Sequence, residues 1–194
     1  MSTLYLTDIR NLPEDLSSLL PLLSSGRRRR LGLLADEKSR RRCIAAGLLL
    51  RRVQGRDEVV LQGGSPFSLA HSGDRVVLAV AQGPVGVDIE QHRPLRFLAL
   101  TTRFFAPSER ALVNSPADFF GLWTAKEALA KMLGVGMART MRRYTLERSE
   151  GGFTCPAFPD LTLLTLPLLP GYSLTLCGKE PYDGQIERVD FVVA

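Results

Sequence analysis

Four side chains in two short segments have the types and spacing of a metal-assisted phosphoryl transfer site. Asp88 and Glu90 stand two residues apart in a short apolar segment that reads as a strand, so both carboxylates point to one face. Glu127 and Lys131 stand four apart in a segment that reads as a helix and share a face there. Three carboxylates brought together in this way make a hard oxygen site suited to Mg²⁺, with Mn²⁺ as the alternative ion. The neighbouring lysine fits a phosphate bound to that metal.

Each of these features also has a simpler interpretation. Asp88 and Glu90 could form the solvated side of an edge strand, and Glu127 and Lys131 could form an ordinary surface ion pair on a helix. His71 lies where a predicted strand meets a turn, so it could cap the turn or donate to a phosphate. No Gly-rich phosphate loop or dinucleotide-binding turn is present. Any bound phosphate would therefore be held by metal, His71 and basic side chains.

The charge of the chain is basic and concentrated near its beginning. The formal net charge is +5, and three arginine runs occupy residues 27–30, 40–42 and 51–52. Such runs attract polyanions or acidic protein surfaces, although a single run can also be a solvated helix face. We expect at least one of them to bind an anion.

Composition and length indicate an ordinary globular protein. The chain has 194 residues, of which 45% are apolar and 23% charged, and it is long enough to bury a core. No stretch approaches a membrane span, and the first residues lack a signal-peptide pattern. Cys43, Cys155 and Cys177 are too few and too scattered for a disulfide framework or a zinc motif. We therefore expect a cytoplasmic protein that does not enter a membrane.

Apolar periodicity and turn residues predict an alternation of helices and short strands. A long helix is expected to close at Gly55, and another to begin at a Ser115 N-cap followed by Pro116 and to stop at Gly134. The predicted helices are residues 13–24, 36–53, 95–104, 107–114 and 116–133. The predicted strands are 3–8, 58–61, 66–70, 75–81, 85–90, 144–148, 151–154, 161–166, 171–177 and 187–193.

Helices followed by strands occur twice along the chain. This order predicts an α+β protein of two similar lobes, a pseudo-dimer in which each lobe packs helices on a small, mostly antiparallel sheet. We place the boundary near Gly83-Pro84, with an N-terminal lobe at 1–83 and a C-terminal lobe at 84–194. The metal site would then lie at the interface between the lobes.

Taken together, the motifs resemble those of the 4′-phosphopantetheinyl transferases, in particular the larger single-chain, two-lobed (Sfp-type) branch. The Gly-Val-Asp-Ile-Glu strand and the Trp-Thr-Ala-Lys-Glu-Ala-Leu-Ala-Lys helix fit the two principal patterns of that family throughout. The matching segments are residues 67–72, 86–90, 103–109, 123–131 and 134–136. One departure is Ala70, which replaces the serine that normally precedes the histidine. The loss of that hydroxyl is expected to weaken coenzyme A binding.

The resemblance implies an Mg²⁺-dependent transfer of 4′-phosphopantetheine from coenzyme A to a serine of an acyl or peptidyl carrier protein. Such a holo-(acyl-carrier-protein) synthase releases 3′,5′-adenosine diphosphate. By resemblance, Asp88, Glu90 and Glu127 hold the metal, and Glu127 or a water near it takes the serine proton. The resemblance also implies that Lys131 stabilises the α-phosphate region. The cofactor-binding residues that it implies are His71, Arg42, Arg56, Lys126 and Ser72.

The expected partner is a carrier protein with acidic surroundings at its modified serine, which suits the basic charge of this chain. Fatty-acid, polyketide and nonribosomal-peptide carriers all remain open. A monomer is expected, because one chain would hold the whole site. The alternative is a non-catalytic basic module that binds acidic protein or nucleic acid. Few aromatic residues interleave the arginines, and exposed carboxylates repel phosphates, so nucleic acid is not the expected partner.

Overall fold

The computed structural model describes residues 2–55 and 66–191. The elements of the first half are β1 (Ser2–Asp8), the 3₁₀ helices η1 (Ile9–Asn11) and η2 (Ser17–Leu22), α1 (Ser25–Gly32), α2 (Glu37–Gln54), β2 (Phe67–Ser72) and β3 (Arg75–Val80). The elements of the second half are β4 (Val85–Gln91), α3 (Phe97–Phe104), α4 (Pro107–Arg110), α5 (Pro116–Leu133), α6 (Met137–Arg143), β5 (Glu147–Ser149), β6 (Gly152–Thr154), β7 (Thr162–Thr165), β8 (Tyr172–Gly178) and β9 (Tyr182–Arg188).

The strands form two separate sheets. One has the order β2-β3-β1-β9 and the other the order β4-β8-β7-β6-β5. The described strand pairs are antiparallel apart from β1 and β9, which run parallel. The expected α+β class with small, mostly antiparallel sheets is therefore confirmed.

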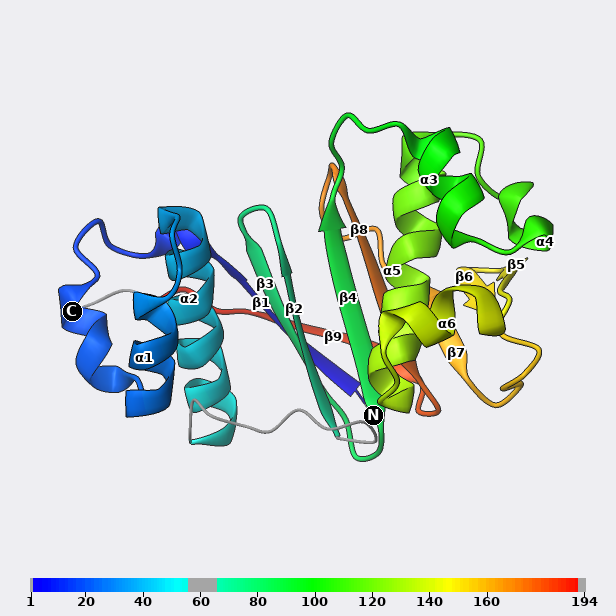
Figure 1. Ribbon diagram of the computed structural model, residues 1–194. Helices are drawn as coiled ribbons and strands as arrows, with labels where there is room; N and C mark the ends of the chain where they lie inside the picture. The colour runs from blue at the N-terminus through cyan, green and yellow to red at the C-terminus, as the bar shows by residue number, and fades with distance from the viewer. Residues whose placement is uncertain (1, 56–65, 192–194) are drawn as a thin grey trace.

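The layers are visible in Figure 1, where α1 and α2 cover one side of the first sheet and α5 lies against β4 and β8 of the second. Between the sheets, apolar side chains of β1, β2 and β3 meet those of β4 and β8. Further cores lie under α2 and around α5. The edge strand β2 of the first sheet thus meets the edge strand β4 of the second sheet in the middle of the molecule.

The two longest helices begin and end where their capping residues predict. The Asp36 side chain accepts a hydrogen bond from the Ser39 N–H and caps α2, which ends at Gly55 with φ of +73°. Ser115 caps α5 in the same way, Pro116 occupies its first turn, and Gly134 ends it with φ of +67°. These boundaries are confirmed.

The helix expected at 13–24 is wrong in type and extent. Residues 17–22 form a 3₁₀ helix with Pro21 inside it, because proline lacks an N–H and its ring clashes with the preceding turn of an α-helix. A new helix, α1, then begins at the Ser24 cap and carries the first arginine run. The helix expected at 107–114 is also shorter, since α4 ends at Arg110.

Two further elements differ from expectation. α6 follows the glycine turn at 134–136, where no helix was predicted. The last strand covers 182–188 rather than 187–193, and it returns to the first sheet beside β1. Its polar sequence carries little apolar signal, because it is an edge strand. The strand expected at 58–61 lies outside the described residues.

All three cysteines are free and buried. In the part of the chain that the structure describes, the helices are too short or too polar to cross a membrane.

Candidate active site

β4 and α5 bring the predicted carboxylates together on one side of the second sheet. Val85, Val87 and Ile89 point into the core between the sheets, so the alternate residues of β4 face α5. Gly86 allows the helix to approach closely, since a Cβ at this position would lie 1.9 Å from the Ala128 carbonyl oxygen. The strand thereby presents Asp88 and Glu90 beside the helix that carries Glu127 and Lys131.

Asp88 forms the centre of this cluster. Its Oδ1 accepts a hydrogen bond from Lys131 Nζ at 2.8 Å, and the carboxylate is almost fully buried. Burial raises the pKa of Asp88 to about 7 against the opposing effect of the Lys131 ammonium, and the negative charges of Glu127 and Glu90 add to the rise. The buried Oδ2 has no hydrogen-bond partner.

Glu127 and Glu90 complete the predicted cluster. Burial raises the pKa of Glu127, the Lys131 ammonium opposes this, and Glu90 adds to it. Glu90 Oε2 accepts a hydrogen bond from Ser72 Oγ at 2.6 Å and lies 3.5 Å from Arg93 Nη1. The three carboxylates are therefore close enough to repel one another.

The chemistry of this cluster fits a divalent cation. Carboxylate oxygens are the ligands that Mg²⁺ prefers, and the unpartnered Oδ2 of Asp88 is a buried acceptor that a cation would satisfy. Within residues 2–55 and 66–191, however, no three Asp, Glu, His or Cys side chains stand close enough together to hold one ion. Binding of one ion by all three carboxylates would thus require Glu90 or Glu127 to move.

A pocket of about 340 Å³ opens beside this cluster, and we call it the α5 pocket. Glu127 and Lys131 are its charged lining residues, and residues 134–136 of the turn after α5 also line it. Its complete lining is Phe67, Ser68, Leu69, Glu127, Ala130, Lys131, Gly134, Val135, Gly136 and Met137. A lining that combines apolar side chains with a lysine suits a substrate with an uncharged arm and an anionic group.

A second pocket of about 230 Å³ contains His71 and Arg42, and we call it the arginine pocket. Arg27 and Arg30 of α1 also line it, and it shares Leu69 with the α5 pocket. The buried Arg42 Nε has no hydrogen-bond partner and so retains a donor for an anion. Burial lowers the pKa of His71, and the Arg42 guanidinium lowers it further. The remaining lining residues are Leu34, Ser39, Cys43, Ala46 and Leu50.

Sequence reasoning missed Arg27 and Arg30 as residues of this pocket. Their three-residue spacing would have placed them on one face of a helix, but the helix that contains them was not predicted. Arg56, predicted to bind the cofactor, lies outside the described residues.

Ser72 and Ala70 point away from the arginine pocket. Ser72 Oγ accepts a hydrogen bond from the Gln91 N–H at 3.1 Å, so its hydroxyl lies on β4 rather than beside His71. Ala70 is 5% exposed and belongs to the core between the sheets. A serine at this position would therefore also face away from His71, and the expected loss of a contact to coenzyme A has no support in the geometry.

Lys126 is not brought to the carboxylate cluster. It is fully buried on another face of α5, where its Nζ lies 2.5 Å from Glu109 Oε1. The ammonium also donates to the carbonyl oxygens of Met141 and Tyr144 at the end of α6. Glu109 accepts hydrogen bonds from the backbone N–H groups of Ala106 and Leu146. The Lys126–Glu109 pair thus connects α4, α5 and α6. It fixes the end of α6, the helix that follows the glycine turn at 134–136.

The substitution Lys126→Met should destabilise the protein by about 3–5 kcal/mol, because it leaves the Glu109 carboxylate buried without its partner charge. The double variant Lys126→Met/Glu109→Gln should recover part of this loss, since no buried charge remains. Urea unfolding measures both values. A single variant as stable as the exposed-surface control Lys179→Met would contradict the assignment.

Comparison with known proteins gives a match over the second half of the chain. Residues 84–177 match the family model of the 4′-phosphopantetheinyl transferase superfamily. The matched region contains β4, α5 and β8, which carry or support the carboxylate cluster.

Individual relatives extend the similarity. The 4′-phosphopantetheinyl transferase psf-1 of Bacillus pumilus is 38% identical over 125 residues, which cover 59% of this chain and 53% of the relative. The 4′-phosphopantetheinyl transferase Sfp of Bacillus subtilis (strain 168) is 29% identical over the same length, 59% of this chain and 55% of the relative. A holo-(acyl-carrier-protein) synthase of Campylobacter jejuni is 39% identical over 54 residues, 28% of this chain and 47% of the relative. The chain thus spans about half the length of the curated relatives it matches.

Proposed function

We propose, from the membership of residues 84–177 in the 4′-phosphopantetheinyl transferase superfamily, that this chain transfers 4′-phosphopantetheine from coenzyme A to a serine of a carrier protein. The family resemblance drawn from the motifs is confirmed by this match and by the Sfp-type relatives. The serine Oγ would form a bond to the phosphorus on the pantetheine side of the pyrophosphate. The bridging P–O bond would break, and 3′,5′-adenosine diphosphate would leave.

One observation carries the proposal: Lys131, the partner of Asp88, lines the α5 pocket, and this pocket shares Leu69 with the arginine pocket of different chemistry. The arginine pocket suits a phosphate, and the α5 pocket suits an uncharged arm next to an anion. Coenzyme A has this sequence of groups, with a nucleotide phosphate at one end, a pyrophosphate in the middle and pantetheine at the other end. A simple basic binding module would have no use for a cluster of three carboxylates beside two such pockets.

Asp88, Glu90 and Glu127 would hold Mg²⁺, or Mn²⁺ in its place, which when bound offsets negative charge on the pyrophosphate. Lys131 would turn from Asp88 toward the α-phosphate and stabilise the charge that develops on the leaving group. Glu127 is the proposed acceptor of the serine proton, because its carboxylate lines the α5 pocket where the substrate would lie.

The 3′-phosphate of coenzyme A would bind in the arginine pocket, against His71, Arg42, Arg27 and Arg30. Planar guanidinium groups form paired hydrogen bonds with phosphate, and Arg42 Nε has a free donor. Arg56 stays a proposed contact to the nucleotide. Lys126 is proposed here as a structural residue instead, and Ser72 as a contact of the carboxylates.

Coenzyme A binding should weaken as the pH rises, because His71 would be neutral in the free protein and charged beside a phosphate. The free-state pKa is lowered by burial and by Arg42, whereas a bound phosphate raises it. Affinity is thus highest below the free-state pKa of His71 and falls by about tenfold until the pH passes the bound-state pKa.

Calorimetry of coenzyme A binding across this range measures the profile. His71→Gln is the matched control, since ionisation of the phosphate itself affects both proteins equally. Identical pH profiles for the two proteins would exclude protonation of His71 on binding.

The architecture supports two similar lobes, residues 1–83 and 84–194, each with an 18-residue helix against a sheet. Strand β9 would then tie the end of the second lobe to the sheet of the first. We infer a monomer that docks an acidic carrier protein with the help of its +5 charge. Light scattering after gel filtration tests the monomer.

Three free, buried cysteines suit the reducing cytoplasm.

The proposed activity is tested by intact-mass spectrometry of an apo fatty-acid carrier protein and an apo peptidyl carrier protein after incubation with this protein, coenzyme A and Mg²⁺. A mass gain of one phosphopantetheine group, abolished by EDTA, is the expected result. No gain on either carrier, together with no calorimetric binding of coenzyme A, would refute the proposal. Binding without transfer would instead favour a binding protein that has lost catalysis.

A further inference from the structure

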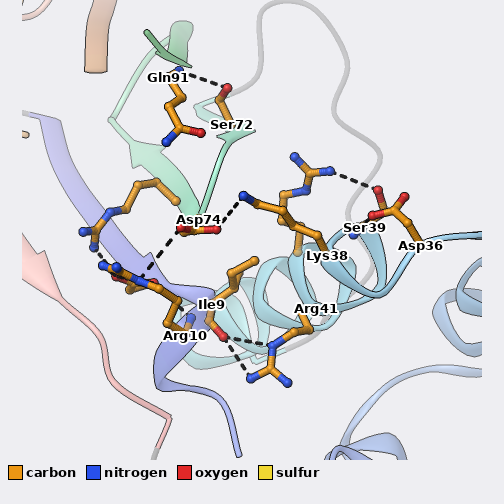
Figure 2. Close-up of polar contacts among 12 residues, drawn as sticks. Ile9, Arg10, Asp36, Lys38, Ser39, Arg41, Ser72, Asp74 and Gln91 are labelled. Carbon is orange, nitrogen blue, oxygen red and sulfur yellow. Dashed lines mark hydrogen bonds and ion pairs between the residues drawn. The ribbon is translucent and has the colours of Figure 1, made fainter. Parts of the chain in front are cut away.

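β2 and β4 are edge strands of different sheets, yet they lie side by side in a fixed register. The Val87 N–H donates to Ser68 Oγ at 3.0 Å, and the Gln91 N–H donates to Ser72 Oγ at 3.1 Å. Figure 2 shows the second of these contacts. Each pair is 19 residues apart in sequence, so the two strands run parallel. They are joined through side chains instead of a backbone ladder.

The Lys131 side chain reaches between β2 and β4 and contacts the backbone of both strands. Its Nζ donates to the carbonyl oxygen of Leu69 on β2 at 3.4 Å and to that of Val87 on β4 at 3.0 Å. The serine hydroxyls therefore satisfy backbone donors of β4, and the ammonium satisfies one backbone acceptor of each strand. The meeting of two sheet edges is in this way hydrogen-bonded without closing the gap.

The same register places residue 70 between the two serines, where a serine hydroxyl could accept a hydrogen bond from β4 and where Ala70 has none to offer. Residue 70 lies opposite residue 89, midway between the pairs Ser68–Val87 and Ser72–Gln91. Amides of alternate residues in an antiparallel strand point to the same side, so the Ile89 N–H points to this edge with those of Val87 and Gln91. Ala70 is buried there and has no hydroxyl.

Ser72 has a second contact that links the join to the proposed site. Its hydroxyl donates to Glu90 Oε2 at 2.6 Å while it accepts from the Gln91 N–H. The end of β2 next to Ser72 is itself anchored, since Asp74 pairs with Lys38 of α2 at 2.7 Å (Figure 2). The Asp74 N–H also donates to the Tyr172 hydroxyl of β8 at 3.2 Å. Ser72, next to this anchored end of β2, thus holds the Glu90 carboxylate of β4 in the other sheet.

We propose that Ser68 and Ser72 are positioning residues that join the two sheets edge to edge. By fixing β4 against β2, they set the carboxylates of β4 relative to the arginine pocket on the other side of β2. In this role each hydroxyl binds β4; Ser68 also lines the α5 pocket, whereas Ser72 lines neither the α5 pocket nor the arginine pocket. The structural join stands on the contacts above, and its effect on transfer rests on the proposed function.

Amide hydrogen exchange followed by NMR tests the join without reference to activity. Ser68→Ala should accelerate exchange of the Val87 amide by about tenfold, and Ser72→Ala that of the Gln91 amide, since each loses one hydrogen bond. Ala70→Ser should slow exchange of the Ile89 amide by a similar factor. Ser149→Ala, on an exposed strand of the second sheet, is the control. Unchanged exchange at all three amides would overturn the join.

Transfer kinetics test the positioning role. Ser72→Ala should lower kcat by about tenfold and leave metal-free binding of coenzyme A unchanged, because Ser72 lines neither the α5 pocket nor the arginine pocket. Ser72→Thr, which keeps the hydroxyl, should restore the contribution of Ser72. An unchanged kcat together with accelerated exchange would overturn the positioning role. A wild-type protein without transfer would refute the proposed function instead, and the exchange experiment would still decide the join.

Discussion

Asp88→Asn is expected to lower kcat for phosphopantetheine transfer by at least about 10²-fold, the scale for losing one group that stabilises transition-state charge. The substitution keeps the shape of the side chain and removes its negative charge. It thereby replaces a buried carboxylate ligand proposed for the metal, which is also the ion-pair partner of Lys131, with a neutral amide. The rate of mass gain on the carrier protein measures the effect.

Loss of folding would not explain this result. Burial makes the charged form of Asp88 costly in the metal-free protein, as its raised pKa indicates, so a neutral side chain should fold at least comparably. Thermal unfolding and metal-free coenzyme A binding are therefore expected to stay close to those of the wild type. Glu147→Gln, a charge-neutralising change on an exposed strand, is the matched control. Equal transfer rates for Asp88→Asn and wild type would exclude the proposed metal site.

The parts of the site that sequence predicted are those that depend on local periodicity and capping. A strand repeats every two residues, so the apolar positions 85, 87 and 89 fixed the opposite face for Asp88 and Glu90. The helix around Glu127 has a serine cap and a terminal glycine that any reader of the sequence can find. The family motifs placed these elements together, which local pattern alone does not do.

The parts that sequence missed depend on contacts between distant residues. Lys126 stands next to Glu127 in a family motif, and only the folded chain reveals Glu109 as its partner. The same pair binds the end of α6, a helix that begins after glycine without a side-chain cap. The start of α1 was not predicted, because the segment before it contains Pro21 and does not show a clear helical pattern. The positions of Arg27 and Arg30 on that helix were therefore missed as well.

Gly86→Ala is expected to destabilise the protein by at least about 3 kcal/mol, at or above the upper end of ordinary overpacking. The added Cβ would lie 1.9 Å from the Ala128 carbonyl oxygen and 2.8 Å from the Met132 backbone nitrogen. Both atoms belong to the backbone of α5, so no side chain can rotate away, and the helix must move from β4. Urea unfolding measures the loss, which should be accompanied by loss of transfer activity because Glu127 and Lys131 move with the helix.

Gly121→Ala supplies the matched control, because it adds the same methyl group to α5 at a position where no atom outside the adjoining backbone of the helix lies within 4 Å of the new Cβ. There the substitution should stabilise the protein by up to about 1 kcal/mol, since alanine favours a helix interior over glycine. If Gly86→Ala lowers the free energy of unfolding and Gly121→Ala raises it, then glycine is required at position 86 by the close packing of α5 on β4 and not by the conformational freedom of its own backbone. Similar stabilities for the two variants would mean that α5 can shift without cost. The strand and the helix would then not hold the carboxylates in a fixed arrangement.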